Sequence, residues 1–151
     1  MRKQGFTILE ILVVLAVLAI LIGIAVPRIK GMQDQGNIQK AKSELKTLQA
    51  AVEAYNINHG AYPASVTTLG TFLASESVKI VPGAMVDPFI ADGTEYKYVF
   101  APPYYIIWSA GPGAARTITG INASGVLQGT LGDDICITNS SDASVDTECI
   151  H

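Results

Sequence analysis

Sixteen consecutive apolar or small residues occupy positions 11–26, and Glu10 directly precedes them. At about 1.5 Å per residue, residues 6–26 make about 32 Å of helix, enough to cross the hydrocarbon of a bilayer. A carboxylate inside hydrocarbon costs roughly 2.5–3.5 kcal/mol on insertion scales. Glu10 therefore needs either a cationic partner or a position at the edge of the membrane.

Three interpretations of this N-terminus compete. A secretory signal peptide would be removed after the small-x-small site Gly23-Ile24-Ala25. Pro27 just beyond that site disfavours the cut, and Glu10 interrupts the start of the apolar run. A plain signal anchor explains the length of the segment and its basic start, which keeps the N-terminal end in the cytoplasm, but leaves Glu10 unexplained. The third is a short basic leader that ends at Gly5 and is followed by a retained helix from Phe6.

The third interpretation accounts for the whole stretch "GFTILEILVVLAVLAILIGIAVP" at residues 5–27. This stretch resembles the class III leader of the type IV pilin superfamily, which includes the pseudopilins of type II secretion. The resemblance implies that a prepilin peptidase cuts after Gly5 and methylates the new amino terminus at Phe6. It also implies that the apolar helix is kept and used in filament assembly.

Cleavage after Gly5 would give Glu10 a chemical partner. The new amine at Phe6 and the carboxylate of Glu10 are four residues apart, near the same face of a helix. In a packed bundle the amine of one subunit can pair with Glu10 of a neighbour, and a buried carboxylate without such a partner is penalised. The family resemblance implies this assembly role for Phe6 and Glu10; the alternative is a carboxylate that snorkels at the membrane edge.

Helical periodicity continues beyond the apolar run. A narrow apolar stripe recurs at steps of three and four residues, at Ile38, Ala41, Leu45, Leu48, Val52 and Tyr55. We expect this helix to end near Gly60 and to protrude in its front half. Pro27, Gly31 and Gly36 make residues 27–36 its weakest turns, with a kink at Pro27; in the resembled family this region can lose helix on assembly.

The rest of the chain predicts a small antiparallel β-meander packed on the stripe, an α+β pilin-like fold. A short helix is expected at residues 66–73, and strands are expected at 95–101, 104–110, 116–122 and 126–131 because each run ends in Pro, Gly or Asn. The Asp-Pro-Phe stretch at 87–89, before the first strand, resembles the major pseudopilins of type II secretion.

The tail at residues 132–151 is acidic and contains both cysteines of the chain, Cys136 and Cys149. No other cysteine competes, so we predict a disulfide; two free thiols would suit a cytosolic protein better. Such C-terminal disulfide loops occur in type IV pilins, whereas major pseudopilins usually carry a calcium loop near this end. Weak candidates for Ca²⁺ ligands are Asp133, Asp134, Asp142 and Asp146; no other cofactor is expected.

The remaining composition excludes several classes. The net charge of −3 gives no basic footprint for nucleic acid. We find no phosphate-binding glycine loop, nucleophile elbow or haem-attachment motif, so an enzyme is not expected. The predicted organisation is a leader, a membrane and filament-core helix, an amphipathic helix, a loop region with the sheet, and a disulfide-closed loop, at residues 1–5, 6–26, 27–59, 60–131 and 132–151.

The sequence therefore predicts a filament subunit, most similar to the major pseudopilins. Its expected partners are copies of itself, prepilin peptidase, a platform membrane protein with an assembly ATPase, and inner-membrane lipid before assembly. We expect a single-pass bacterial inner-membrane protein with a periplasmic C-terminal domain, and then a periplasmic or cell-surface filament. The alternatives are a major type IV pilin used in adhesion or motility, and a monomeric membrane-anchored periplasmic binding domain.

Overall fold

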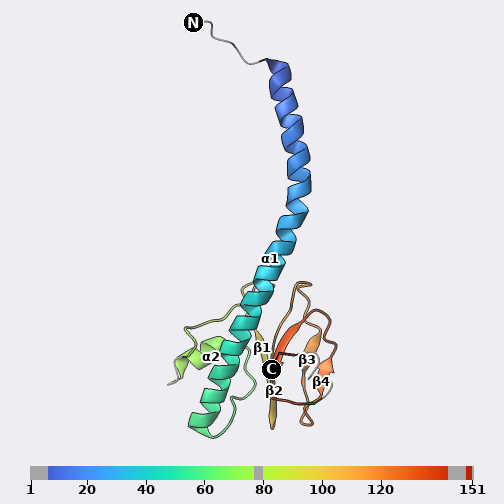
Figure 1. Ribbon diagram of the computed structural model, residues 1–151. Coiled ribbons are helices and arrows are strands. Elements are labelled where there is room, and N and C mark those ends of the chain that lie inside the picture. Colours follow the sequence, from blue (N-terminus) through green and yellow to red (C-terminus); the bar gives the residue numbers. More distant parts are fainter. Residues whose placement is uncertain (1–6, 77–79, 143–148, 151) are drawn as a thin grey trace. The chain divides into compact units, whose positions relative to one another are not determined.

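The computed structural model describes residues 7–76, 80–142 and 149–150, with side chains left out at 25–28. The chain forms two compact units, which meet in sequence between Gly36 and Asn37. Helix α1 (Ile8–His59) contributes to both units (Figure 1). It ends at Gly60, whose φ of 72° is the left-handed conformation that glycine adopts readily at helix C-termini, so the expected stop is confirmed.

The second unit is built on the predicted apolar stripe of α1. Ala41, Leu45, Leu48 and Val52 are buried, while Ile38 and Tyr55 at the two ends of the stripe are half-buried. The stripe from Ala41 to Tyr55 packs against the short helix α2 (Leu69–Ser75) and one face of a β-sheet. The α+β class, with a long helix packed on a small antiparallel sheet, is confirmed.

The strands form two antiparallel sheets. One sheet has the order β1-β2-β5 and the other pairs β3 with β4. Within the described residues the strands, drawn as arrows in Figure 1, are β1 (Lys97–Ala101), β2 (Tyr104–Ser109), β3 (Ile118–Ile121), β4 (Leu127–Gly129) and β5 (Ile135–Thr138). The four predicted strands are therefore present but divided over two sheets, and the predicted loop of the tail supplies a fifth.

Strand β2 is the centre of this unit because it is buried on both faces. Tyr105 and Ile107 lie in the core cluster under α1, whereas Ile106 and Trp108 lie in a second cluster with β3 and the disulfide. Alternate residues of a strand point to opposite faces, so one strand serves both cores. This explains why "YYIIWS" is an almost unbroken apolar run.

The predicted disulfide joins Cys136 and Cys149, with the two Cα atoms 4.7 Å apart. Cys136 lies on β5, opposite Trp108 of β2. The bridge brings Ile150 beside Ile137, where the Ile150 N–H donates to the Cys136 carbonyl at 2.9 Å. The outer edge of β5 is thereby covered at this point, which blocks further strand pairing there.

Helix α2 begins at Leu69, three residues later than the helix we expected at 66–73. The Glu95 carboxylate accepts hydrogen bonds from the N–H groups of Gly70 (2.8 Å) and Thr71 (3.3 Å). A distant carboxylate thus satisfies the free N–H groups of the first turn and fixes where the helix starts. No local pattern in the sequence could have located that start.

Removing the disulfide should destabilise the second unit by about 3 kcal/mol, because the bridge restricts the unfolded chain over a short loop. We expect the Cys136→Ser, Cys149→Ser double variant to show this loss in urea unfolding of the full chain in detergent. Fluorescence of Trp108, which shares the cluster of the bridge, reports the transition. Reduction of the unaltered chain is the matched control, and an unchanged free energy of unfolding in both would contradict the prediction.

The buried tyrosines predict that the second unit unfolds at alkaline pH. Burial raises the pKa of Tyr98 above its ordinary value, and burial together with the neighbouring Glu53 raises that of Tyr105. A raised folded pKa favours the neutral phenol, so the stability it contributes is present below about pH 10 and is lost as the pH rises further. Ultraviolet titration should show these phenols ionising together with loss of circular dichroism; ionisation in the intact fold would contradict this.

Candidate functional site

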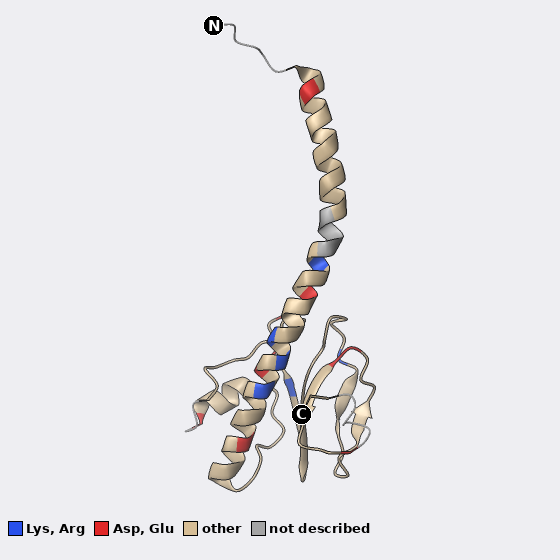
Figure 2. Ribbon diagram, viewed as in Figure 1, with Lys and Arg blue, Asp and Glu red and all other residues tan. Residues whose placement is uncertain are grey.

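The first unit exposes an apolar surface on every side of its helix. All residues from 8 to 24 are exposed, including Ile8 at 85% and Ile22 at 59%. Among the described helices, α1 alone is long and apolar enough to cross a membrane. In Figure 2 one acidic position near the start of α1 precedes a long uncharged stretch, and basic positions return farther along. A helix that is apolar all round needs lipid or other helices to cover it.

Glu10 lies in the first turn of this helix. Its backbone N–H donates to the Thr7 carbonyl at 3.1 Å and to the Thr7 hydroxyl at 3.2 Å, so Thr7 caps the helix. Glu10 is exposed, and it forms no ion pair with any residue that the structure describes. A carboxylate beside the partial positive charge of a helix N-terminus is favoured there, but it remains available to a cation from another molecule.

An apolar hollow of about 320 Å³ lies against the first two turns of the helix. It is lined by Ile8, Ile11, Leu12 and Leu15. These residues follow helical spacing, so they form one face of the first two turns. Glu10 does not line the hollow and, by helical spacing, lies on the opposite side of the helix, so the carboxylate and the hollow are separate contact surfaces.

The structure gives little information on three other predicted site residues, Gly5, Phe6 and Pro27. Gly5 and Phe6, the predicted cleavage and methylation residues, are outside the described residues. Helix α1 is continuous through Pro27, Gly31 and Gly36, so the predicted weak turns are helical in this single chain. The kink at Pro27 stays a prediction.

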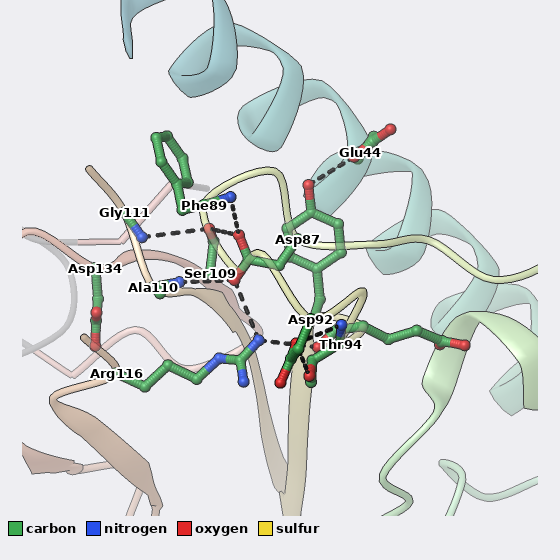
Figure 3. Close-up of polar contacts among 12 residues, drawn as sticks. Glu44, Asp87, Phe89, Asp92, Thr94, Ser109, Ala110, Gly111, Arg116 and Asp134 are labelled. Atoms are coloured by element: carbon green, nitrogen blue, oxygen red, sulfur yellow. Dashed lines mark hydrogen bonds and ion pairs between the residues drawn. The ribbon is translucent and has the colours of Figure 1, made fainter. Parts of the chain in front are cut away.

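In the second unit, Asp87 is a buried hub that the sequence did not reveal. Its carboxylate is fully buried and accepts hydrogen bonds from the Ser109 hydroxyl (2.8 Å), the Ala110 N–H (2.9 Å) and the Phe89 N–H (3.1 Å) (Figure 3). The Arg116 guanidinium pairs with it at 3.2 Å. The Asp-Pro-Phe turn is thus fastened to the end of β2.

Arg116 extends this hub to the first strand. The same guanidinium nitrogen donates to the Glu95 carbonyl at 3.1 Å, while the Glu95 carboxylate holds the start of α2. One chain of contacts therefore connects α2, the turn before β1 and the end of β2. The signals in the sequence were the aspartate before Pro88 and an arginine isolated among apolar and small residues, but neither indicates its partner.

The acidic tail does not gather into a metal site within the described residues. No group of three or more acidic, histidine or cysteine side chains with metal-binding geometry occurs there. One Asp134 oxygen accepts from the Thr117 N–H (2.8 Å) and the Ile118 N–H (2.7 Å), and Asp133 accepts from the Gly113 N–H. Burial raises the pKa of Asp134, whose other oxygen is buried without a hydrogen-bond partner in the structure.

Calcium takes six to eight oxygen ligands, and these two carboxylates already serve backbone N–H groups. Asp133 and Asp134 therefore do not supply the set of oxygen ligands that Ca²⁺ needs. Asp142 has further interactions of its own, and Asp146 is outside the described residues. Calcium binding at this tail stays a prediction.

Asp87→Ala should destabilise the second unit by about 3–5 kcal/mol, because it leaves the Arg116 charge and the buried Ser109 hydroxyl without their acceptor. Urea unfolding of the full chain in detergent measures this loss. Asp92→Ala removes an exposed carboxylate a few residues away and serves as the matched control, with a much smaller expected loss. Equal losses in the two variants would show that the hub does not hold the unit together.

Two family models match the chain, in adjoining segments. Residues 1–26 match the "Prokaryotic N-terminal methylation motif", and residues 28–125 match "Type II secretion system (T2SS), protein G". The first match contains the capped helix start with Glu10. The second contains the stripe of α1, the Asp87 hub and strands β1 to β3.

Several curated relatives carry the name "Type II secretion system core protein G". The protein from Pectobacterium carotovorum subsp. carotovorum is 32% identical over 81 residues, which is 54% of this chain and 52% of the relative. Those from Klebsiella pneumoniae and Vibrio cholerae serotype O1 are 32% and 39% identical, over 52% and 42% of this chain and 56% and 44% of the relatives.

The chain spans about half the length of the curated relatives it matches. No solved structure matches it. The protein G model nevertheless covers well over half of the chain, and it adjoins the methylation motif in the order that the leader sequence predicts. The chain belongs to the type II secretion system protein G family.

Proposed function

We propose that this protein is the major pseudopilin of a type II secretion system, a structural subunit rather than an enzyme. The observation that carries the proposal is the apolar surface on all sides of residues 8–24, with Glu10 at its start. Such a surface can be stored in lipid and later covered by the same segment of other copies. Its work is mechanical, in a homopolymeric filament that moves folded substrates toward an outer-membrane channel.

Maturation follows from the N-terminal segment. Prepilin peptidase cuts after Gly5 and methylates the amine of Phe6, in keeping with the methylation motif matched at residues 1–26. The retained chain then begins at Phe6, one residue before the helix cap at Thr7. Cleavage also removes Arg2 and Lys3, so the mature N-terminus carries its positive charge on the amine alone.

The role of Glu10 follows from electrostatics. Within the bundle its carboxylate pairs with the Phe6 amine of a neighbouring subunit. A carboxylate without a partner is penalised in this low-dielectric setting, so pairing favours docking in one axial register. In the single chain the described residues give Glu10 no ionic partner.

The location and the assembly partners follow from the same features. Before assembly the subunit spans the inner membrane once, with its second unit in the periplasm, where a disulfide such as Cys136–Cys149 persists. A platform membrane protein and an assembly ATPase then extract it into a periplasmic pseudopilus. Removal of the helix from lipid is offset by burial of its apolar surface against other subunits.

One observation favours a second candidate, a major type IV pilin used in adhesion or motility. The tail is closed by the Cys136–Cys149 bridge, and similar C-terminal disulfide loops occur in type IV pilins. A monomeric membrane-anchored binding domain is the remaining alternative, but it leaves the position of Glu10 beside the apolar segment unexplained. The test below separates the filament proposals from that alternative.

Replacing Glu10 tests the proposal directly. Glu10→Gln and Glu10→Ala should lower filament yield from the full chain more than about tenfold, because an unpaired amine in the bundle costs several kcal/mol and each 1.4 kcal/mol is a factor of ten. The measurement is the amount of protein in sheared or cross-linked filaments, normalised to protein in the membrane.

Glu76→Gln is the matched control for this experiment. It removes a carboxylate of the second unit that, among the described residues, forms an ion pair only with the exposed His59, at 3.5 Å. The control should assemble like the unaltered chain. Normal assembly of both Glu10 variants would refute the role given to Glu10.

A further inference from the structure

Charge is distributed unevenly along the chain. Residues 28–46 contain five basic and two acidic residues, whereas residues 47–151 contain ten acidic and three basic residues. The basic residues therefore concentrate on the middle of α1, and the acidic ones in the rest of the second unit (Figure 2). Opposite charges on different parts of one subunit can attract two copies to each other.

The basic part of α1 in the second unit borders a groove. A hollow of about 470 Å³ is lined by Lys42, Lys46 and Ile150, together with Gln39 and Ser43. An adjoining hollow of about 470 Å³ shares Lys42 and Ile150 but is also lined by Asp133 and Asp134, so its lining is not predominantly basic. We call the first hollow, whose lining residues include no acidic side chain, the lysine groove.

The lysine groove has free cations and a fixed apolar wall. Lys42 and Lys46 are exposed and form no ion pair with any described residue, whereas Lys40 on the same helix pairs with Glu44 at 3.9 Å. Ile150 is held in place by the adjacent disulfide and by its hydrogen bond to Cys136. The groove is thus prepared for a ligand that brings a carboxylate next to small or apolar atoms.

Most carboxylates of the second unit are already engaged. Asp87, Glu95 and Asp134 are buried and hold backbone N–H groups. Glu53 accepts from the hydroxyls of Tyr62 (3.0 Å) and Tyr105 (2.7 Å). These side chains cannot reach another molecule without loss of internal contacts.

Asp92 is exposed in a turn and, unlike the exposed Asp133, lines neither of the two hollows. Its carboxylate accepts from the Thr94 N–H at 2.9 Å and from the Thr94 hydroxyl, which also lower its pKa (Figure 3). Ala91 and Gly93 on either side are small and exposed. The turn therefore presents an ionised, fixed carboxylate on a narrow tip, as the lysine groove requires.

We propose that the lysine groove of one copy binds the Asp92 turn of a second copy. This proposal rests on the filament function proposed above and names a contact within it. The groove and the turn are made of different residues, so each copy can bind one neighbour through its groove and another through its turn. Contacts between two unlike patches produce open polymers, whereas a self-complementary patch closes a dimer.

The contact is repeated at every subunit of the filament, and its strength depends on the ionic strength. A single exposed ion pair contributes little, but every subunit of a polymer would make one, so small gains accumulate along the filament. Exposed charges are screened at high ionic strength. Filaments should accordingly lengthen at low salt in a manner that depends on Lys42 and Asp92.

Cross-linking tests the proposed proximity. The full chain carrying Lys42→Cys and Asp92→Cys is assembled in its host and treated with a short bis-maleimide, which spares the disulfide-bonded Cys136 and Cys149. A ladder of covalent dimers and higher oligomers is expected. Lys40→Cys with Asp92→Cys is the matched control; it places the thiol on the same helix outside the groove and should give at least tenfold less ladder.

Charge exchange tests whether the contact matters. Lys42→Glu with Lys46→Glu, and Asp92→Lys alone, should each reduce filament yield several-fold, and combining Lys42→Glu with Asp92→Lys should restore it. Filaments that depend on Glu10 but show no ladder and no effect of charge exchange would overturn the groove proposal alone. Absence of filaments from the unaltered chain would overturn the filament function, and the groove proposal with it.

Discussion

The structure depends on one constraint, that residues 8–24 expose apolar side chains in every direction. Water cannot be the lasting environment of such a surface, because its transfer from water is worth about 25 cal/mol per Å². Lipid and neighbouring helices are the two environments that satisfy it. The proposed pairing of Glu10 distinguishes between them, since in that proposal Glu10 gains a cation only from another subunit.

In the second unit the same helix forms part of a folded core. Beyond Asn37, α1 is amphipathic and buries one stripe against a sheet whose central strand, β2, is covered on both faces. The exposed side of this part carries Lys42 and Lys46. Helix α1 thus provides an apolar rod in one unit, and the core and a charged surface in the other, as expected of a subunit that must be stored singly and used in a polymer.

Features that follow from local pattern were predictable from the sequence. The helix and its end at Gly60, the buried stripe, four strands and the disulfide each leave a short-range signal of spacing, glycine or cysteine count. The methylation motif and protein G family matches agree with the resemblance seen in residues 5–27. Glu10 was identified because a charge beside an apolar run is conspicuous in any sequence.

Features that depend on distant partners were not predictable. Strand β5 has only four residues and reads as part of an acidic loop, yet it completes the sheet by pairing with β2. The burial of Asp87 depends on Arg116, 29 residues away. The start of α2 depends on Glu95, 25 residues after Gly70. Such contacts arise from the tertiary fold, which spacing along the chain does not encode.

The mass of the N-terminal peptide, taken from protein purified from its native membrane, tests the central claim most directly. The account predicts a peptide that begins at Phe6 and carries one added methyl group, which places the amine where Glu10 of a neighbour can pair with it. A peptide that begins at Met1, or one that begins at Val26, would contradict the account, because neither supplies that amine beside a retained apolar helix.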